Sequence, residues 1–202
     1  MQIRELALPH AWELTPVQHP DERGLFLEWF KAEEFEAATG RSFDLRQANL
    51  SVSKRGVVRG IHFAAVPIGQ AKYVTCVAGS VLDVIIDIRV GSPTFGEWDA
   101  VVLDDVKRNC VFLSEGLGHL FVATSDSATV SYLTTDKYRP GSEHGINPAD
   151  PALALELPDD AIMSERDVAA PTLAEALAAG LLPTFDASLA AYAAARTLGS
   201  VS

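Results

Sequence analysis

Short runs of small, β-branched and aromatic residues, separated by turn-forming residues, recur from residue 3 to residue 135. The clearest example is residues 47–78, where such runs are interrupted by turn residues at 54–56 and 66–69. Runs of this composition predict a β-meander rather than a helix. Because they recur at roughly ten-residue intervals, they predict an antiparallel sandwich or barrel and argue against βαβ units.

The expected elements follow from these runs and from helix signals. Residues 31–39 have the spacing of a short amphipathic helix, and residues 171–175 carry a capping box that opens a helix ending at Gly180. The remaining expected elements are strands at 3–18, 23–30, 80–89, 97–103, 110–113, 119–124 and 129–135, and an alanine-rich helix at 186–196. No linker divides the chain, so we expect one domain over residues 1–202 with a helical tail at 172–202.

The composition is ordinary for a globular protein, with an acidic bias. Hydrophobic residues make up 48% of the 202 positions, and the formal net charge is −11. This charge argues against nucleic-acid polymers and anionic membrane surfaces as partners. The most apolar stretch, 81–88, is too short to span a bilayer, and residues 1–12 lack the apolar core of a signal peptide. Two cysteines form neither a disulfide framework nor a zinc pattern, so the sequence predicts a cytoplasmic protein.

Polar residues lie inside the expected strands of the central meander. They are Gln47, Asn49, Arg59, His62 and Lys72. Cationic side chains are seldom buried without a partner, so on strands they need a carboxylate, an anion or a cavity to face. Taken singly, Arg59 and Lys72 are explained as edge charges and His62 as a satisfied core histidine. Their combination within one meander instead predicts a concavity that binds a ligand.

Several kinds of chemistry have no motif in this sequence. It has no phosphate-binding glycine loop, no nucleophile elbow and no HxH or HExxH pair among its five histidines. We therefore expect no metal. Proton transfer remains, since His62 is suited to act as a base near neutral pH and Lys72 to stabilise an oxyanion. Tyr132 either faces this site or is a core tyrosine bonded to the backbone.

Seven segments occur in an order and spacing that match one enzyme family. They are DERGLFLEWF (21–30), QANLSVS (47–53), VVRGIHF (57–63), QAKYVTCVAGSVLDVIIDIRVGSPTFGEW (70–98), SEGLGHLF (114–121), YLTTDKYRP (132–140) and SERD (164–167). The chain resembles the dTDP-4-dehydrorhamnose 3,5-epimerase family, and more closely its actinomycete members that act on dTDP-4-keto-6-deoxyhexoses for antibiotic sugars. The resemblance implies an all-β, cupin-type double-stranded β-helix (jelly roll) with short peripheral and C-terminal helices, which forms a homodimer and uses no metal or cofactor.

The resemblance also implies a role for individual residues. His62 matches the family's base, and Asp167 matches the carboxylate that orients and charges it. Lys72 matches the residue that faces the C4 oxygen, and Tyr132 the acid on the opposite face of the sugar. The implied substrate-binding residues are Arg59 and His119 for phosphate and sugar, Arg23 for the diphosphate, Phe26 and Tyr138 for the thymine, and Glu28, Gln47 and Asn49 for the nucleotide and sugar pocket.

The implied reaction is epimerisation of a dTDP-4-keto-6-deoxyhexose at C3, with C5 left open. The 4-keto group acidifies the protons on C3 and C5, so a base can remove one while Lys72 holds the enolate. The alternatives are a catalytically idle cupin that binds a nucleotide sugar, a metal-dependent cupin enzyme and a C5-only epimerase. The His62 and Asp167 pair favours an enzyme, because binding alone does not need it.

Two positions depart from the family pattern, and one stretch bears on assembly. Leu120 follows His119 where the family has a small residue, and Ala64 stands where many relatives have glutamine. Leu120 predicts a narrower cavity or a tilted His119. This bulk, together with the resemblance to antibiotic-sugar enzymes, several of which invert only one centre, favours inversion at C3 first. Trp29 and Phe30 make the N-terminal strands too apolar for a free edge, so we expect a homodimer with strand exchange at the N-terminus.

Overall fold

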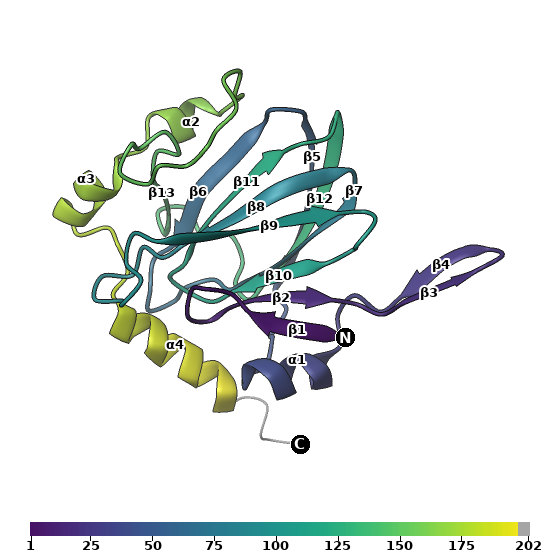
Figure 1. Cartoon of the computed structure of the whole chain (residues 1–202). Helices are drawn as coiled ribbons and strands as arrows, with labels where there is room; N and C mark the ends of the chain where they lie inside the picture. Colours follow the sequence, from purple (N-terminus) through teal and green to yellow (C-terminus); the bar gives the residue numbers. More distant parts are fainter. Residues whose placement is uncertain (198–202) are drawn as a thin grey trace.

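Two antiparallel β-sheets packed face to face form the body of the computed structural model, which describes residues 1–197 (Figure 1). One sheet contains β1 (Gln2–Glu5), β2 (Ala11–Thr15), β10 (Cys110–Leu113), β7 (Lys72–Ala78), β12 (Ser127–Thr134) and β5 (Gln47–Lys54), in that order. The other contains β13 (Glu143–Gly145), β6 (Val58–Ala64), β11 (Gly118–Ala123), β8 (Ser80–Ile86) and β9 (Trp98–Asp104), in that order. The prediction of an all-β antiparallel sandwich or barrel is confirmed.

The layer between the sheets is apolar over much of its extent. Val74 and Val130 of the six-stranded sheet belong to one buried cluster with Val81 and Ile85 of the five-stranded sheet. Successive side chains on a strand point to opposite faces, so Asp83, between the last two, points into the same layer. The inward-facing side chains of β8 therefore include a carboxylate between two apolar residues.

Each sheet is also covered on its outer face. Chain from 146 to 182 packs on the five-stranded sheet, and the cluster formed there includes Ile61, Phe63 and Leu120. On the six-stranded sheet, Phe35 and Tyr192 belong to an aromatic cluster with residues of β2, β7 and β10. Burying such a side chain contributes about 1.5–3 kcal/mol, so these outer layers stabilise strands that are apolar on both faces.

A two-stranded hairpin projects from the body. It is formed by β3 (Gln18–Asp21) and β4 (Gly24–Leu27), and it extends away from both sheets (Figure 1). Phe26 is paired with His19 towards the base of the hairpin and is 65% exposed. The predicted strand at 23–30 is therefore shorter than expected and lies outside the sandwich.

The helices follow their capping signals. Helix α1 (Ala32–Thr39) ends at Gly40, whose φ of 71° is the left-handed conformation that glycine adopts readily. Helix α3 (Leu173–Ala178) begins with the predicted capping box, in which the Thr172 hydroxyl accepts a bond from Glu175 N. Helix α4 (Phe185–Thr197) covers the predicted alanine-rich helix. Residues 198–202 of the predicted tail lie outside the described residues.

One expectation about secondary structure was wrong, and two short elements were not predicted. The single strand expected at 3–18 is divided into β1 and β2, because the chain turns back at residues 6–10, where His10 has a φ of 68°. Helix α2 (Glu165–Val168) and strand β13 were not predicted, since each is too short to show a periodic pattern. None of the helices within residues 1–197 is long and apolar enough to cross a membrane.

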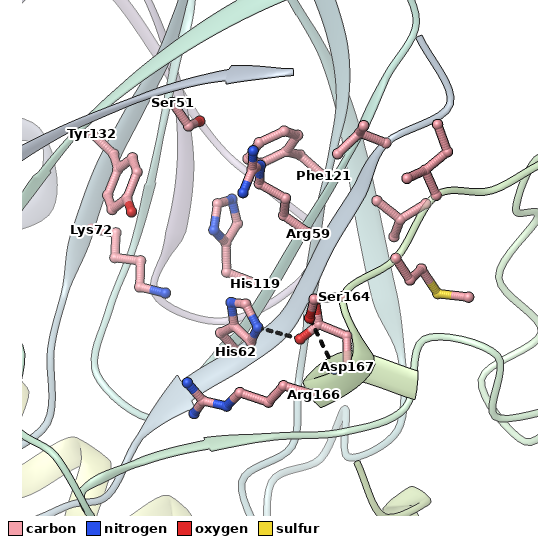
Figure 2. Close-up of a pocket in the computed structure, with 14 residues that line it drawn as sticks. Ser51, Arg59, His62, Lys72, His119, Phe121, Tyr132, Ser164, Arg166 and Asp167 are labelled. Carbon is pink, nitrogen blue, oxygen red and sulfur yellow. Dashed lines mark hydrogen bonds and ion pairs between the residues drawn. The ribbon is translucent and has the colours of Figure 1, made fainter. Parts of the chain in front are cut away.

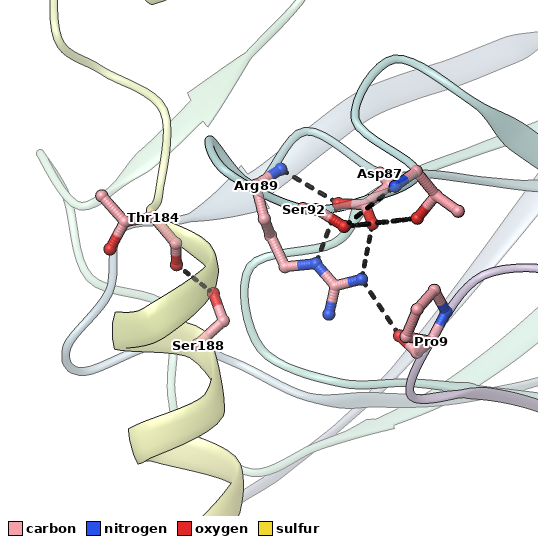
Figure 3. A network of polar contacts seen from close by, with 7 residues as sticks. Pro9, Asp87, Arg89, Ser92, Thr184 and Ser188 are labelled. Carbon is pink, nitrogen blue, oxygen red and sulfur yellow. Dashed lines mark hydrogen bonds and ion pairs between the residues drawn. The ribbon is translucent and has the colours of Figure 1, made fainter.

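Two buried arginines hold α4 against the end of the sandwich. Figure 3 shows Arg89 bonded to both carboxylate oxygens of Asp87 and to the carbonyl of Pro9. The Arg89 guanidinium lies 5.0 Å from the centre of the Phe185 ring at the start of α4. Arg41 pairs with Glu115, and its guanidinium lies 4.9 Å from the Tyr192 ring of the same helix. These contacts join the N-terminal segments to α4.

Candidate active site

A cavity of about 520 Å³ opens between the two sheets (Figure 2). It is lined by Ser51, Val57, Val58, Arg59, His62, Lys72, His119, Phe121, Tyr132, Ile162, Met163, Ser164, Arg166 and Asp167. All four expected catalytic residues are in this set, together with two of the expected substrate-binding residues. The predicted concavity therefore exists, and it collects side chains from both sheets and from α2.

His62 on β6 forms a hydrogen bond with Asp167 on α2. His62 Nε2 lies 2.6 Å from Asp167 Oδ1, and the Asp167 side chain is 6% exposed. The Ser164 hydroxyl accepts a bond from Asp167 N and so caps the short helix that carries this carboxylate. Since an ionised carboxylate only accepts, Nε2 carries the proton and Nδ1 of neutral His62 is free to take one.

The environment of His62 matches the requirements of a base. Burial lowers its pKa below the ordinary 6.5, while the hydrogen bond to Asp167 opposes that shift. A histidine with a lowered pKa is neutral at pH 7 and can accept a proton. Asp167 would then stabilise the imidazolium that forms. The pair therefore combines a neutral resting base with support for its charged state.

Lys72 and Tyr132 lie on the opposite wall, on β7 and β12 of the six-stranded sheet (Figure 2). Burial lowers the pKa of Lys72, while Glu143 and Asp83 act in the opposite direction. Burial raises the pKa of Tyr132, so its hydroxyl keeps its proton at neutral pH. Tyr132 lines the cavity, and among residues 1–197 no partner bonds to its hydroxyl, so the interpretation as a core tyrosine bonded to the backbone was wrong. This wall offers a cation and a proton donor.

A second histidine–carboxylate pair lies deeper in the cavity and was not predicted as a pair. His119 faces His62 across neighbouring strands, and its Nε2 lies 2.8 Å from Asp83 Oδ2. Asp83 is fully buried, and its Oδ1 has no partner among the described residues. The alternation of VLDVII, with one aspartate at an inward position, was the sequence signal for it. The pair orients the His119 ring towards the cavity.

Two arginines make the rim of the cavity positive in an otherwise acidic protein. Arg59 is held by a bond of 3.0 Å to the Ser53 hydroxyl, and Arg166 donates to the carbonyl of Glu143 at 3.0 Å. Arg166 was not singled out from the sequence, although it lies in the SERD segment beside Asp167. Guanidinium groups suit phosphate recognition because they offer several donors in a fixed plane.

The Leu120 side chain does not narrow the cavity, which corrects the expectation from sequence. Leu120 is fully buried in the cluster on the outer face of the five-stranded sheet, whereas His119 points inward. Neighbouring residues on a strand face opposite sides, so the added bulk lies outside the site. Ala64 lines a small separate cleft next to Glu143 and does not line the main cavity.

The other expected binding residues lie outside the cavity lining. Gln47 and Asn49 are on β5, on the same face as Ser51, and the backbone N–H of Tyr138 donates to Gln47. Three more are in or next to the projecting hairpin, which points away from this cavity: Arg23, Phe26 and Glu28. Within one chain these three are therefore not brought to the site.

Metal ligands are not grouped in the described part of the chain. No three His, Cys, Asp or Glu side chains among residues 1–197 are placed to hold one ion. The polar residues of the cavity form histidine–carboxylate pairs and cationic groups instead. Such a set can transfer protons and stabilise anions. That the protein uses no metal or cofactor stays a prediction.

Comparison with known proteins agrees with this arrangement. Residues 5–175 match the family model described as dTDP-4-dehydrorhamnose 3,5-epimerase. A dTDP-4-dehydrorhamnose 3,5-epimerase of Mycolicibacterium smegmatis is 57% identical over 187 residues, which cover 92% of each chain. A dTDP-4-dehydrorhamnose 3-epimerase of Streptomyces niveus is 54% identical over 202 residues, covering 100% of this chain and 98% of the relative.

A solved structure extends the similarity to the fold. NovW, a 4-keto-6-deoxy sugar epimerase from the novobiocin gene cluster of Streptomyces spheroides, superposes with a TM-score of 0.91 at 55% identity, covering 93% of this chain and 95% of NovW. The predicted cupin-type jelly roll is thereby confirmed. The family match covers most of the chain and includes every residue of the cavity. The chain belongs to the dTDP-4-dehydrorhamnose 3,5-epimerase family of isomerases.

Proposed function

We propose that the protein epimerises a dTDP-4-keto-6-deoxyhexose at C3, and that C5 is open to the same chemistry. The observation that carries this proposal is the Asp167-bonded imidazole of His62, which faces Lys72 and Tyr132 across one cavity (Figure 2). A base on one wall and a proton donor on the other are the two groups that inversion of a carbon requires. The proposed setting is the synthesis of deoxysugars for natural products, in the cytoplasm.

The proposed reaction begins with the 4-keto group of the sugar, which acidifies the neighbouring C–H bonds. Nδ1 of His62 removes a proton from the ring carbon, and Asp167 stabilises the resulting imidazolium. The Lys72 ammonium binds the C4 oxygen as it becomes an enolate oxygen. Tyr132 then gives its proton to the opposite face of the carbon, which inverts the centre. No step requires a cofactor.

The nucleotide part of the substrate is assigned to the positive rim. Arg59 and Arg166 are placed to neutralise the diphosphate, and His119 to contact the phosphate or the sugar. The thymidine would lie beside this rim, next to the end of β5. The residues there are Gln47, Asn49 and Tyr138, which are joined by hydrogen bonds. A net charge of −11 does not oppose this binding, since a small anion responds to the local cations.

We further propose a homodimer in which the hairpin of one protomer reaches the cavity of the other. The hairpin exposes Phe26 and carries Arg23, two of the expected ligand contacts, and neither lies in the cavity of its own chain. The edge strand β5 also exposes Leu50 and Val52, which are 64% and 60% accessible. Exposed apolar residues on an edge strand favour association with another chain.

The regiochemistry is proposed as C3 first. The catalytic groups are the same for C3 and C5, and displacements of about 1 Å decide which carbon reacts. The Leu120 side chain lies outside the cavity, so its bulk does not favour reaction at C3 over reaction at C5. Tyr132 is present as an acid for the second face, so double inversion is chemically open.

The function is tested by incubating the protein with dTDP-4-keto-6-deoxyglucose in D₂O and following H3 and H5 by NMR. The expected result is uptake of deuterium at C3. Uptake at C5, if it occurs, should come after uptake at C3. No uptake at either carbon, with dTDP still bound, would leave a binding module instead of an enzyme. Activity that disappears with a chelator would instead indicate a metal-dependent cupin.

A further inference from the structure

The carboxylate that supports the proposed base lies on a helix too short to be stable by itself. Helix α2 has four residues, and a single helical turn fixes many backbone angles for few hydrogen bonds. Of these four residues only Asp167 is buried, and Val168 is 53% exposed. Apolar packing therefore contributes little to the position of α2. Polar bonds to the surrounding chain must fix Asp167 relative to His62.

The start of α2 is anchored to the sheet and by its own cap. Ile162 exchanges two backbone bonds with the segment that opens β6, donating to Gly56 O at 2.8 Å and accepting from Val58 N at 2.9 Å. The Ser164 hydroxyl then accepts from Asp167 N at 3.1 Å (Figure 2). These bonds fix the entry into the helix. The last carbonyls of a helix need donors from elsewhere.

A donor reaches the end of α2 from outside the helix, the side chain of Asn147. Its Nδ2 donates to the carbonyl of Val168 at 3.1 Å, and its Oδ1 accepts from Ala149 N at 2.9 Å. A backbone N–H can only donate, so the Asn147 atom that faces Ala149 must be the oxygen. The NH₂ group therefore faces Val168, the residue after Asp167.

The backbone of Asn147 is tied to the strand that carries the base. Its neighbour Ile146 exchanges two backbone bonds with Ile61, one of 3.0 Å and one of 3.3 Å. Ile61 directly precedes His62 on β6. Asn147 therefore follows a residue bonded beside the base, and its side chain bonds beside the carboxylate.

The chain that leaves α2 lies against the same strand. Gly145 is opposite His62 in the pairing of β13 with β6, and a Cβ atom at Gly145 would lie 3.6 Å from the Cβ of Ala170. The backbone N–H of Asn147 also donates to the carbonyl of Pro171 at 2.9 Å. Asn147 thus bonds twice to this part of the chain, once from its side chain and once from its backbone.

We propose that Asn147 is a positioning residue for the base, which keeps the Asp167 carboxylate within hydrogen-bonding distance of His62 by holding the carbonyl of Val168. This inference rests on the proposed function for the role of His62. Asn147 does not line the cavity, so it acts through Asp167. Asp167 stabilises the charged imidazole only while the two side chains are bonded, so a loosened α2 lowers the fraction of competent sites.

The kinetic test is a double-mutant cycle on kcat with dTDP-4-keto-6-deoxyglucose. Asn147→Ser keeps an acceptor for Ala149 N but is too short to reach Val168, and Asn147→Leu removes both bonds. Each should lower kcat about three- to tenfold and leave KM within about twofold, as expected for one lost hydrogen bond away from the ligand. In the Asp167→Asn background each should change kcat less than about twofold. Equal factors in both backgrounds would overturn the proposal.

A matched variant separates this role from general loosening of the chain after β13. Thr172→Val removes the cap of the neighbouring helix α3, which carries no residue of the cavity. Its kcat should stay within about twofold of wild type. A loss equal to that of Asn147→Ser would overturn the proposal. Thermal unfolding of each variant checks that it is folded.

A spectroscopic readout follows the pair without substrate. In protein labelled with ¹⁵N at histidine, the imidazole signals at about pH 8 show which nitrogen of neutral His62 carries the proton. In the wild type it should be Nε2, which faces Asp167. Asn147→Ser should raise the share of the other tautomer towards its value in Asp167→Asn. A share unchanged from wild type would overturn the proposal.

The two readouts also separate this inference from the proposed function. No turnover in the wild type, with the tautomer shift present in Asn147→Ser, would remove the proposed function and leave the positioning of the pair. Normal turnover with no tautomer shift would remove the inference alone.

Discussion

His62 Nε2 and Asp167 Oδ1 are 2.6 Å apart, although 105 positions separate the two residues in the sequence. Strand β6 carries the histidine, and the Ser164-capped helix α2 brings the carboxylate to it. The partner of the base is therefore supplied by a segment on the outer side of the five-stranded sheet.

Replacing either member of the pair should remove proton transfer and leave nucleotide binding nearly intact. His62→Asn should lower turnover by about 10²–10⁴, the usual loss on removing a general base. Asp167→Asn should also be damaging, because the amide cannot stabilise the imidazolium and favours the wrong tautomer. Turnover and deuterium exchange, measured beside dTDP affinity, check this. Near-normal exchange in His62→Asn would show that another group is the base.

The pH profile should be bell-shaped, with its limbs set by His62 and Lys72. The base must be neutral, so kcat/KM should rise with pH through a His62 pKa below 6.5 and be level at pH 7. Lys72 must be charged, so the falling limb should lie below 10.5, because burial lowers the pKa of its ammonium. In Asp167→Asn the support for the charged imidazole is lost, and the acidic limb should move to lower pH. A rising limb above pH 7 would contradict this assignment.

Tyr132→Phe should change the regiochemistry as well as the rate. The hydroxyl is the proposed donor on the face opposite His62, and no other described residue bonds to it. Proton removal needs only the base and should persist at both carbons, whereas inversion of each centre that Tyr132 protonates should fall by about 10²-fold or more. The H3 and H5 signals in D₂O, followed by NMR, give both rates. Equal residual rates at the two carbons would exclude a selective role for Tyr132.

Mixed dimers should recover activity if hairpins are exchanged between protomers. His62→Asn inactivates its own cavity but has an intact hairpin, while Arg23→Ala has an intact cavity but a defective hairpin. In an equal mixture half of the dimers are mixed, and each has one complete site, so roughly one quarter of the sites should be restored. Activity of the co-refolded mixture is the measurement. No recovery, or a 21.7 kDa particle in light scattering at all concentrations, would argue against exchange.

The buried ion pair between Arg41 and Glu115 should matter far more for stability than an exposed one. Their side chains are 1% and 7% exposed, so Glu115→Ala leaves a buried charge and should cost about 3–5 kcal/mol in the free energy of unfolding. Asp126→Ala breaks the pair with Arg55 at a side chain that is 95% exposed, and should cost less than about 1 kcal/mol. Chemical denaturation of both variants compares them, and similar losses would contradict the argument.

The local pattern of the sequence was sufficient for the elements and for part of the site. Runs of β-branched residues with turn residues between them specify antiparallel strands, and the box at Thr172 and Glu175 specifies the start of α3, because both signals act over a few residues. Cations within apolar strands indicated a cavity around His62 and Lys72, since such groups need polar surroundings. Asp167 and Tyr132 took their roles from the family resemblance.

What only the tertiary structure decided is which groups meet and which face each occupies. Leu120 and His119 are neighbours in sequence, and it is the pairing of β11 between β6 and β8 that turns one outward and the other into the site. Asp83 became a partner of His119 for the same reason. Arg23 and Phe26 lie on a hairpin that leaves the sandwich, where one chain alone gives them no ligand to contact. A sequence specifies alternation over a few residues, but the direction of each face is set by strand pairing and packing between segments a hundred residues apart.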